Sequence, residues 1–130
     1  MEFREMMKLS AKEFDRAVQR AIRRIPPQIR KHLDNMVISV QKWPAPELLE
    51  EMGLPPDEPL LGVYTGASLM ERSHFDTLQY PDTIQIFQEP LEEMCETLEE
   101  LEEEIEITVV HEVAHFLGMT EQELADLGYE

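Results

Sequence analysis

The 130-residue sequence has one cysteine, no long apolar run and very few cations beyond its first third. Because Cys95 has no partner for an internal disulfide, we expect a reducing compartment, and the cytoplasm is the simplest choice. No stretch of about 18 apolar residues occurs, which argues against a membrane-spanning helix. The charged N-terminal stretch lacks the apolar core of a secretory signal, so we expect a cytoplasmic chain without a membrane partner.

Positive charge is scarce and unevenly placed in a chain whose net charge is −17. Residues 1–42 hold ten Lys/Arg and five Asp/Glu, whereas residues 43–130 hold Arg72 alone against 23 Asp/Glu. Binding to nucleic acid needs clustered cations, so the acidic part argues against a nucleic-acid partner. The distribution favours a basic N-terminal helix lying on an acidic body. An acidic rim that recruits basic peptides is the alternative.

The hydrophobic content of 42% predicts one folded domain over residues 1–130, with a modest core. Three S/T-x-x-E patterns, beginning at Ser10, Thr97 and Thr120, are typical of helix starts. With proline, glycine and apolar periodicity, they predict helices over 11–25, 28–35, 47–52, 90–95, 98–117 and 121–127. Strands are predicted over 36–43, 60–66 and 83–88. The last of these, TIQIFQ, alternates apolar and polar residues as a half-buried or edge strand would.

The stretch HEVAH, residues 111–115, has the spacing of a metal site on a helix. His111 and His115 are about 40° apart in helical projection and one turn apart along the axis, so both imidazoles can bind one ion. Glu112 lies about 100° round from His111, where it suits a base acting on a water held by that ion. The spacing therefore predicts two zinc ligands, His111 and His115, and one catalytic base, Glu112.

Zinc bound by two histidines needs a third protein ligand. Gly118 can turn the chain back beneath the helix, and Glu121 follows three residues later. We expect Glu121 to be the third ligand. Glu123 and Asp126 are rivals, although Glu123 has a competing role as the capping partner of Thr120.

These motifs resemble the small bacterial zincin-like metallopeptidases known as minimal zincins. The specific part is the element H-E-x-x-H-x-x-G-x-x-acid, and the stretches LLGVYTGASLMERS and YPDTIQIFQEPLEE support it. The resemblance implies an α+β fold, with a small mixed sheet packed on a central helix that carries the motif. It also implies His111 and His115 as Zn²⁺ ligands, Glu112 as the general base and Glu121 as the third ligand. Members commonly have aspartate at this last position, so the longer glutamate is a departure.

The function predicted from these residues is zinc-dependent hydrolysis of peptide bonds, with a zinc-bound water activated by Glu112. We expect a peptide or protein substrate, a monomer, and pairing of TIQIFQ with an extended peptide. Candidates for stabilising the oxyanion are Tyr64, Arg72, His74 and Tyr129. The alternatives are a catalytically weak or inactive zincin scaffold that binds metal or protein, and an acidic protein that binds a basic partner.

Overall fold

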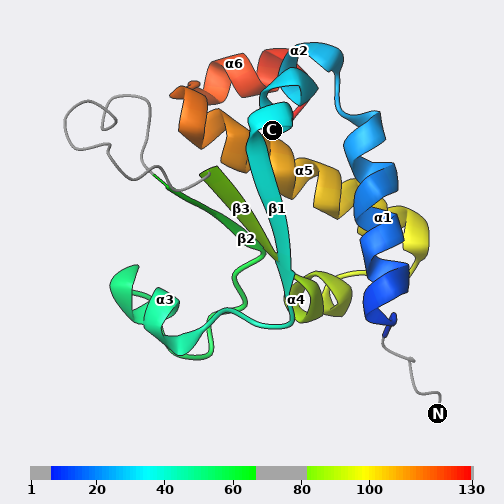
Figure 1. Ribbon diagram of the computed structural model, residues 1–130, viewed down its shortest axis with the longest axis vertical. Helices are drawn as coiled ribbons and strands as arrows, with labels where there is room; N and C mark the ends of the chain where they lie inside the picture. Colours follow the sequence, from blue (N-terminus) through cyan, green and yellow to red (C-terminus); the bar gives the residue numbers. More distant parts are fainter. Residues whose placement is uncertain (1–6, 67–81, 130) are drawn as a thin grey trace.

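The computed structural model describes residues 7–66 and 82–129, and shows a three-stranded sheet covered on one side by long helices (Figure 1). The elements, in chain order, are α1 (Ala11–Arg24), α2 (Pro27–Arg30), the 3-10 helix η1 (Lys31–Asn35), β1 (Met36–Gln41), α3 (Pro46–Glu51), β2 (Gly62–Thr65), β3 (Asp82–Phe87), α4 (Gln88–Glu93), α5 (Leu98–Leu117) and α6 (Glu121–Asp126). The predicted α+β class is confirmed. The predicted turn at residues 67–81 lies outside the described residues.

Helix ends follow the capping patterns of the sequence. Ser10, Thr97 and Thr120 each cap a helix, and each forms the reciprocal pair of bonds of a capping box with the glutamate three residues later. Helix α4 differs from its prediction, because it begins at Gln88 rather than at Pro90. A proline is tolerated in the first turn because its missing N–H would have no intrahelical acceptor there.

The sheet has the strand order β1-β3-β2, with β1 parallel and β2 antiparallel to β3. Of the two alternatives for TIQIFQ, the half-buried strand is confirmed and the edge strand is wrong, because β3 is the central strand and both its edges are paired. The expected pairing of TIQIFQ with an extended peptide is therefore wrong as well. The alternation within β3 has another cause. Ile84 and Ile86 are fully buried, while Thr83 and Gln85 on the other face are half-buried. The alternation of apolar and polar residues in β3 therefore reflects a sheet with one face in the core and one face partly exposed, and not an unpaired edge.

Helix α5 forms the centre of the core. It contacts β2 and β3 on one side and α1 on another, as Figure 1 shows. The core contains fully buried residues from α1, β3 and α5, among them Phe14, Ala17, Ile84, Ile86, Leu101, Ile105, Val109 and Val113. This apolar packing fixes the axis of α5 against the sheet. None of the described helices is long and apolar enough to cross a membrane.

The predicted packing of a basic N-terminal helix on an acidic body is confirmed. Arg20 on α1 lies 2.6 Å from Glu102 on α5, and Arg24 lies 3.0 Å from Glu106 one turn further along. The side chain of Arg20 is 41% exposed, because Glu102 covers part of it. The two ion pairs align α1 with α5 along their shared interface.

Candidate metal and catalytic site

His111, Glu112 and His115 all lie in the C-terminal half of α5. Val109 and Val113, which flank His111 in sequence, are fully buried and anchor this part of the helix in the core. His111 is half-buried, and its Nε2 atom is buried without a hydrogen-bond partner among the described residues. A buried polar atom without a partner lowers the free energy of unfolding. A metal ion bound to this nitrogen would remove that cost.

His115 lies one turn further along α5, and its side chain is 65% exposed. Its Nδ1 atom is 3.5 Å from Oε1 of Glu112. The described residues therefore present one buried and one exposed imidazole nitrogen on the same helix, with a carboxylate beside them. Such an arrangement suits a site that is held by the protein on one side and open to a ligand on the other.

Glu112 is held by the sheet as well as by its own helix. Its Oε1 atom accepts a hydrogen bond of 2.9 Å from the backbone N–H of Tyr64 on β2, and its side chain is only 14% exposed. Burial raises the pKa of Glu112 above its usual value, while His115, the Tyr64 N–H and His111 oppose this shift. A carboxyl whose pKa is raised by burial is a stronger proton acceptor than an exposed one.

The predicted third ligand, Glu121, does not lie in a group with the two histidines. Across residues 7–66 and 82–129, no three His, Cys, Asp or Glu side chains lie in a group that could hold a metal ion. Glu121 is the exposed first residue of α6, so the structure does not gather it with His111 and His115. Its rivals have other partners, since Glu123 accepts a bond of 2.8 Å from the Thr120 N–H and Asp126 accepts one of 2.9 Å from Gln122. Glu121 is the acid of this helix whose side chain has no such bond to the described residues.

The donor set nevertheless suits zinc. Two imidazoles one helical turn apart are ligands that this ion prefers, and one of them has a buried nitrogen without a partner in the described part of the chain. The chain is also turned toward α6 directly after the histidines. Gly118 ends α5 with a positive φ of 72°, and Met119 N–H bonds to the Ala114 carbonyl at 3.0 Å. Glu121 thus starts the helix that follows the turn.

Two of the four oxyanion candidates have hydroxyl groups that are already bonded. Tyr64 donates to Asp82 at 2.7 Å, and its ring lies 5.5 Å from that of Phe116. Tyr129 donates to Glu106, the acid that also pairs with Arg24, and so ties the end of the chain to α5. The other two candidates, Arg72 and His74, lie outside the described residues.

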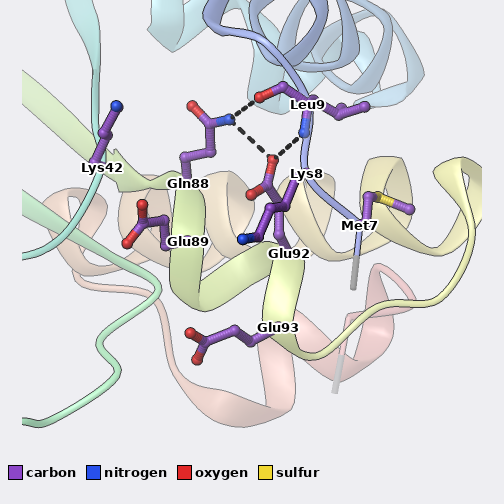
Figure 2. Close-up of a pocket in the computed structure, with 8 residues that line it drawn as sticks. All are labelled: Met7, Lys8, Leu9, Lys42, Gln88, Glu89, Glu92 and Glu93. Atoms are coloured by element: carbon purple, nitrogen blue, oxygen red, sulfur yellow. Dashed lines mark hydrogen bonds between the residues drawn. The ribbon is translucent and has the colours of Figure 1, made fainter. Parts of the chain in front are cut away.

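A separate cavity of about 360 Å³ lies between α4 and the segment that precedes α1 (Figure 2). Two of the residues that line it, Gln88 and Glu92, are buried. Gln88 donates to the Leu9 carbonyl, and Glu92 accepts from the Leu9 N–H. The backbone N–H and C=O groups of Leu9 are therefore both hydrogen-bonded. These bonds satisfy the two polar groups within the chain, and the cavity shares no residue with the histidine site.

Strand β2 contributes to this site, which was not predicted from the sequence. Gly62, the backbone N–H of Tyr64 and Thr108 surround Glu112 from the sheet side and from the preceding helical turn. A signal was present, because Thr108 is a polar residue on the buried side of α5, and Gly62 is a glycine in a predicted strand. A glycine inside a strand often marks a close approach of another chain segment.

Comparison with known proteins gives one finding. A family model described as zincin-like metallopeptidase matches residues 33–129, which include β1, β2, β3 and the whole of α5. A search of curated proteins found no match. The matched segment contains every residue of the candidate site.

Proposed function

Since the chain belongs to the zincin-like metallopeptidases, we propose that it is a zinc-dependent peptidase acting on a peptide or protein substrate. In this proposal His111, His115 and Glu121 hold the metal, and Glu112 is the general base. The observation that carries the proposal is the buried Nε2 of His111, which has no partner among the described residues. The next residue in the sequence is Glu112, whose carboxylate is held by β2. Few buried polar atoms in native proteins lack a hydrogen-bond partner, and a bound metal ion would explain this one.

Zinc, when bound, would lower the pKa of a coordinated water to about 7 and polarise the scissile carbonyl. The chain's own contribution is to position and move a proton. Oε1 of Glu112 is held by the Tyr64 N–H, which leaves Oε2 to take the proton from the attacking water. The same carboxyl then returns the proton to the leaving amine.

The direct test is the substitution Glu112→Gln. Glutamine keeps the size of the side chain and its acceptor oxygen but cannot take the proton. We expect zinc content to be unchanged and cleavage of unstructured peptides to fall by about 10²–10⁴-fold. Glu103→Gln is the matched control, because it makes the same change at an exposed position of the same helix. Retained cleavage in Glu112→Gln would contradict the assignment of the base.

A second candidate is a zincin scaffold that binds metal or a protein partner without efficient catalysis. The observation in its favour is that Glu121 is exposed and is not gathered with the histidines. The two candidates differ in what Glu112→Gln does in the cell of origin. Loss of the biological function supports the peptidase, whereas its retention supports the scaffold.

A further inference from the structure

Three residues of α5 that lie one turn apart face strand β2. Thr108, Glu112 and Phe116 follow one another at intervals of four, so they form one stripe along the helix. Two residues of β2 lie against this stripe. Gly62 lies against Thr108, and the ring of Tyr64 lies 5.5 Å from the ring of Phe116. Glu112 is between these two contacts, where it meets the backbone of β2.

The first contact is possible only because residue 62 is a glycine. A Cβ atom added at Gly62 would lie 2.6 Å from Cγ2 of Thr108 and 3.1 Å from the backbone oxygen of Gln85. Atoms do not approach so closely, so any larger residue would force β2 and α5 apart. Gly62 and Thr108 are both buried, which leaves little room for a side chain to move aside.

The hydrogen bond from β2 to Glu112 depends on the contact between Gly62 and Thr108. Leu61 accepts a bond from the N–H of Phe87, so Leu61 and Phe87 form a hydrogen-bonded pair of the antiparallel ladder. In such a ladder the hydrogen-bonded pairs alternate, which directs the N–H of Tyr64 away from β3. That N–H donates to Oε1 of Glu112 at 2.9 Å. A shift of β2 by a few tenths of an ångström would therefore lengthen a bond to the carboxylate.

We propose that Gly62 and Thr108 are positioning residues, whose close contact sets the distance at which the Tyr64 N–H holds the carboxylate of Glu112. The inference rests on the proposed function of Glu112 as a base. It adds that the sheet, and not the helix alone, aims this carboxylate. Held at one oxygen by a rigid strand, the carboxylate presents the other oxygen in one direction, and this pre-organisation is lost when β2 moves.

The experiment uses the full chain and the variant Gly62→Ala, combined with two substitutions of Thr108 that each change one heavy atom of the threonine side chain. Thr108→Ser removes Cγ2, the atom that the new Cβ would meet, whereas Thr108→Val keeps it. We expect Gly62→Ala to lower kcat by about 10–100-fold, with little change in KM or zinc content. Gly62→Ala/Thr108→Ser should recover part of kcat, because the contact with Gln85 remains, and Gly62→Ala/Thr108→Val should not.

A second measurement reports the bond itself and needs no activity. The Tyr64 amide should exchange slowly in the wild type and faster in Gly62→Ala and in Glu112→Ala. Val18→Ala, a core change in α1, controls for lost stability and should leave kcat unchanged. The inference is overturned if Gly62→Ala leaves Tyr64 exchange unchanged, or if the Ser and Val rescues behave alike. If the wild type cleaves no peptide, the proposed function fails, and the amide measurement still decides the positioning of Glu112.

Discussion

At the scale of single residues, the site is defined by which polar atoms already have partners. Glu112, Glu123 and Asp126 each have a bond that fixes their carboxyl group, whereas Nε2 of His111 has none among the described residues. A carboxylate that forms a hydrogen bond within its own helix must give up that bond, and the stability it provides, to bind a metal ion. In the proposed zinc site we therefore expect Glu121, rather than Glu123 or Asp126, to be the third ligand.

Exchange of Glu121 and Glu123 for alanine separates these roles. We expect Glu121→Ala to weaken zinc binding by more than about tenfold, since even the outer partners of a metal site contribute that much. Glu123→Ala should instead cost about 1 kcal/mol of stability through the lost cap and leave zinc affinity almost unchanged. Titration with a zinc chelator measures the affinity, and urea unfolding of the metal-free protein measures the stability. Equal zinc affinity in all three proteins would remove Glu121 from the site.

Cys95 illustrates a residue whose chemistry is suppressed by its surroundings. Its side chain is buried, and this burial, with Glu104 and Glu100 nearby, raises the pKa of the thiol to about 11. At pH 8 we expect alkylation of the native protein to be more than about 100-fold slower than that of the unfolded chain. The folded state binds the thiol proton more tightly than the unfolded chain does. The resulting contribution of protonated Cys95 to the free energy of unfolding is therefore complete below the pKa of the thiol in the unfolded chain. It is lost as pH rises from about 9 toward 11. Fast alkylation of the native protein would contradict this.

At the scale of elements, the features that were predicted correctly are those set by neighbouring residues, such as the ends of helices. The capping boxes at Ser10, Thr97 and Thr120, with Gly118, fixed the bounds of α5 and the start of α6 closely, because a cap acts within four residues. The HEVAH spacing likewise placed three site residues on one helix. Strand order could not be predicted in this way, since pairing joins β1 and β3 across more than 40 residues, and the alternation in β3 is the same at an edge or at the centre.

The junction between α5 and α6 allows a matched pair of substitutions. Gly118 and Gly53 both have a positive φ, 72° and 73°, and a Cβ at either would meet no atom within 4 Å. Alanine at each should therefore cost about 1 kcal/mol through the backbone alone. Only Gly118→Ala should also weaken zinc binding, because Gly118 directs the turn that leads to Glu121. Urea unfolding and chelator titration check the two effects, and an equal loss of zinc affinity at Gly53 would contradict this role of the turn.

At the scale of the whole molecule, the distribution of charge has two opposing effects. Residues 43–130 carry 23 acids and one cation, so their mutual repulsion disfavours the folded state. The ion pairs Arg20–Glu102 and Arg24–Glu106 act in the other direction, where α1 meets α5. Both arginine side chains are more than 40% exposed, so each pair contributes no more than about 1 kcal/mol. Repulsion summed over a net charge of −17 should be the larger effect.

Salt tests which of the two effects is greater, because it screens both. Raising NaCl from about 20 mM to about 300 mM shortens the Debye length from roughly 20 Å to below 8 Å, which removes most repulsion between distant acids. We expect the Tm of the metal-free protein to rise, by about 3–5 °C for each kcal/mol regained. Arg20→Met/Arg24→Met should have a lower Tm at low salt and a larger rise, since it has lost the attraction that salt weakens and kept the repulsion. A fall of Tm with salt in the wild type, absent from the double variant, would show that the α1–α5 ion pairs outweigh the acidic repulsion.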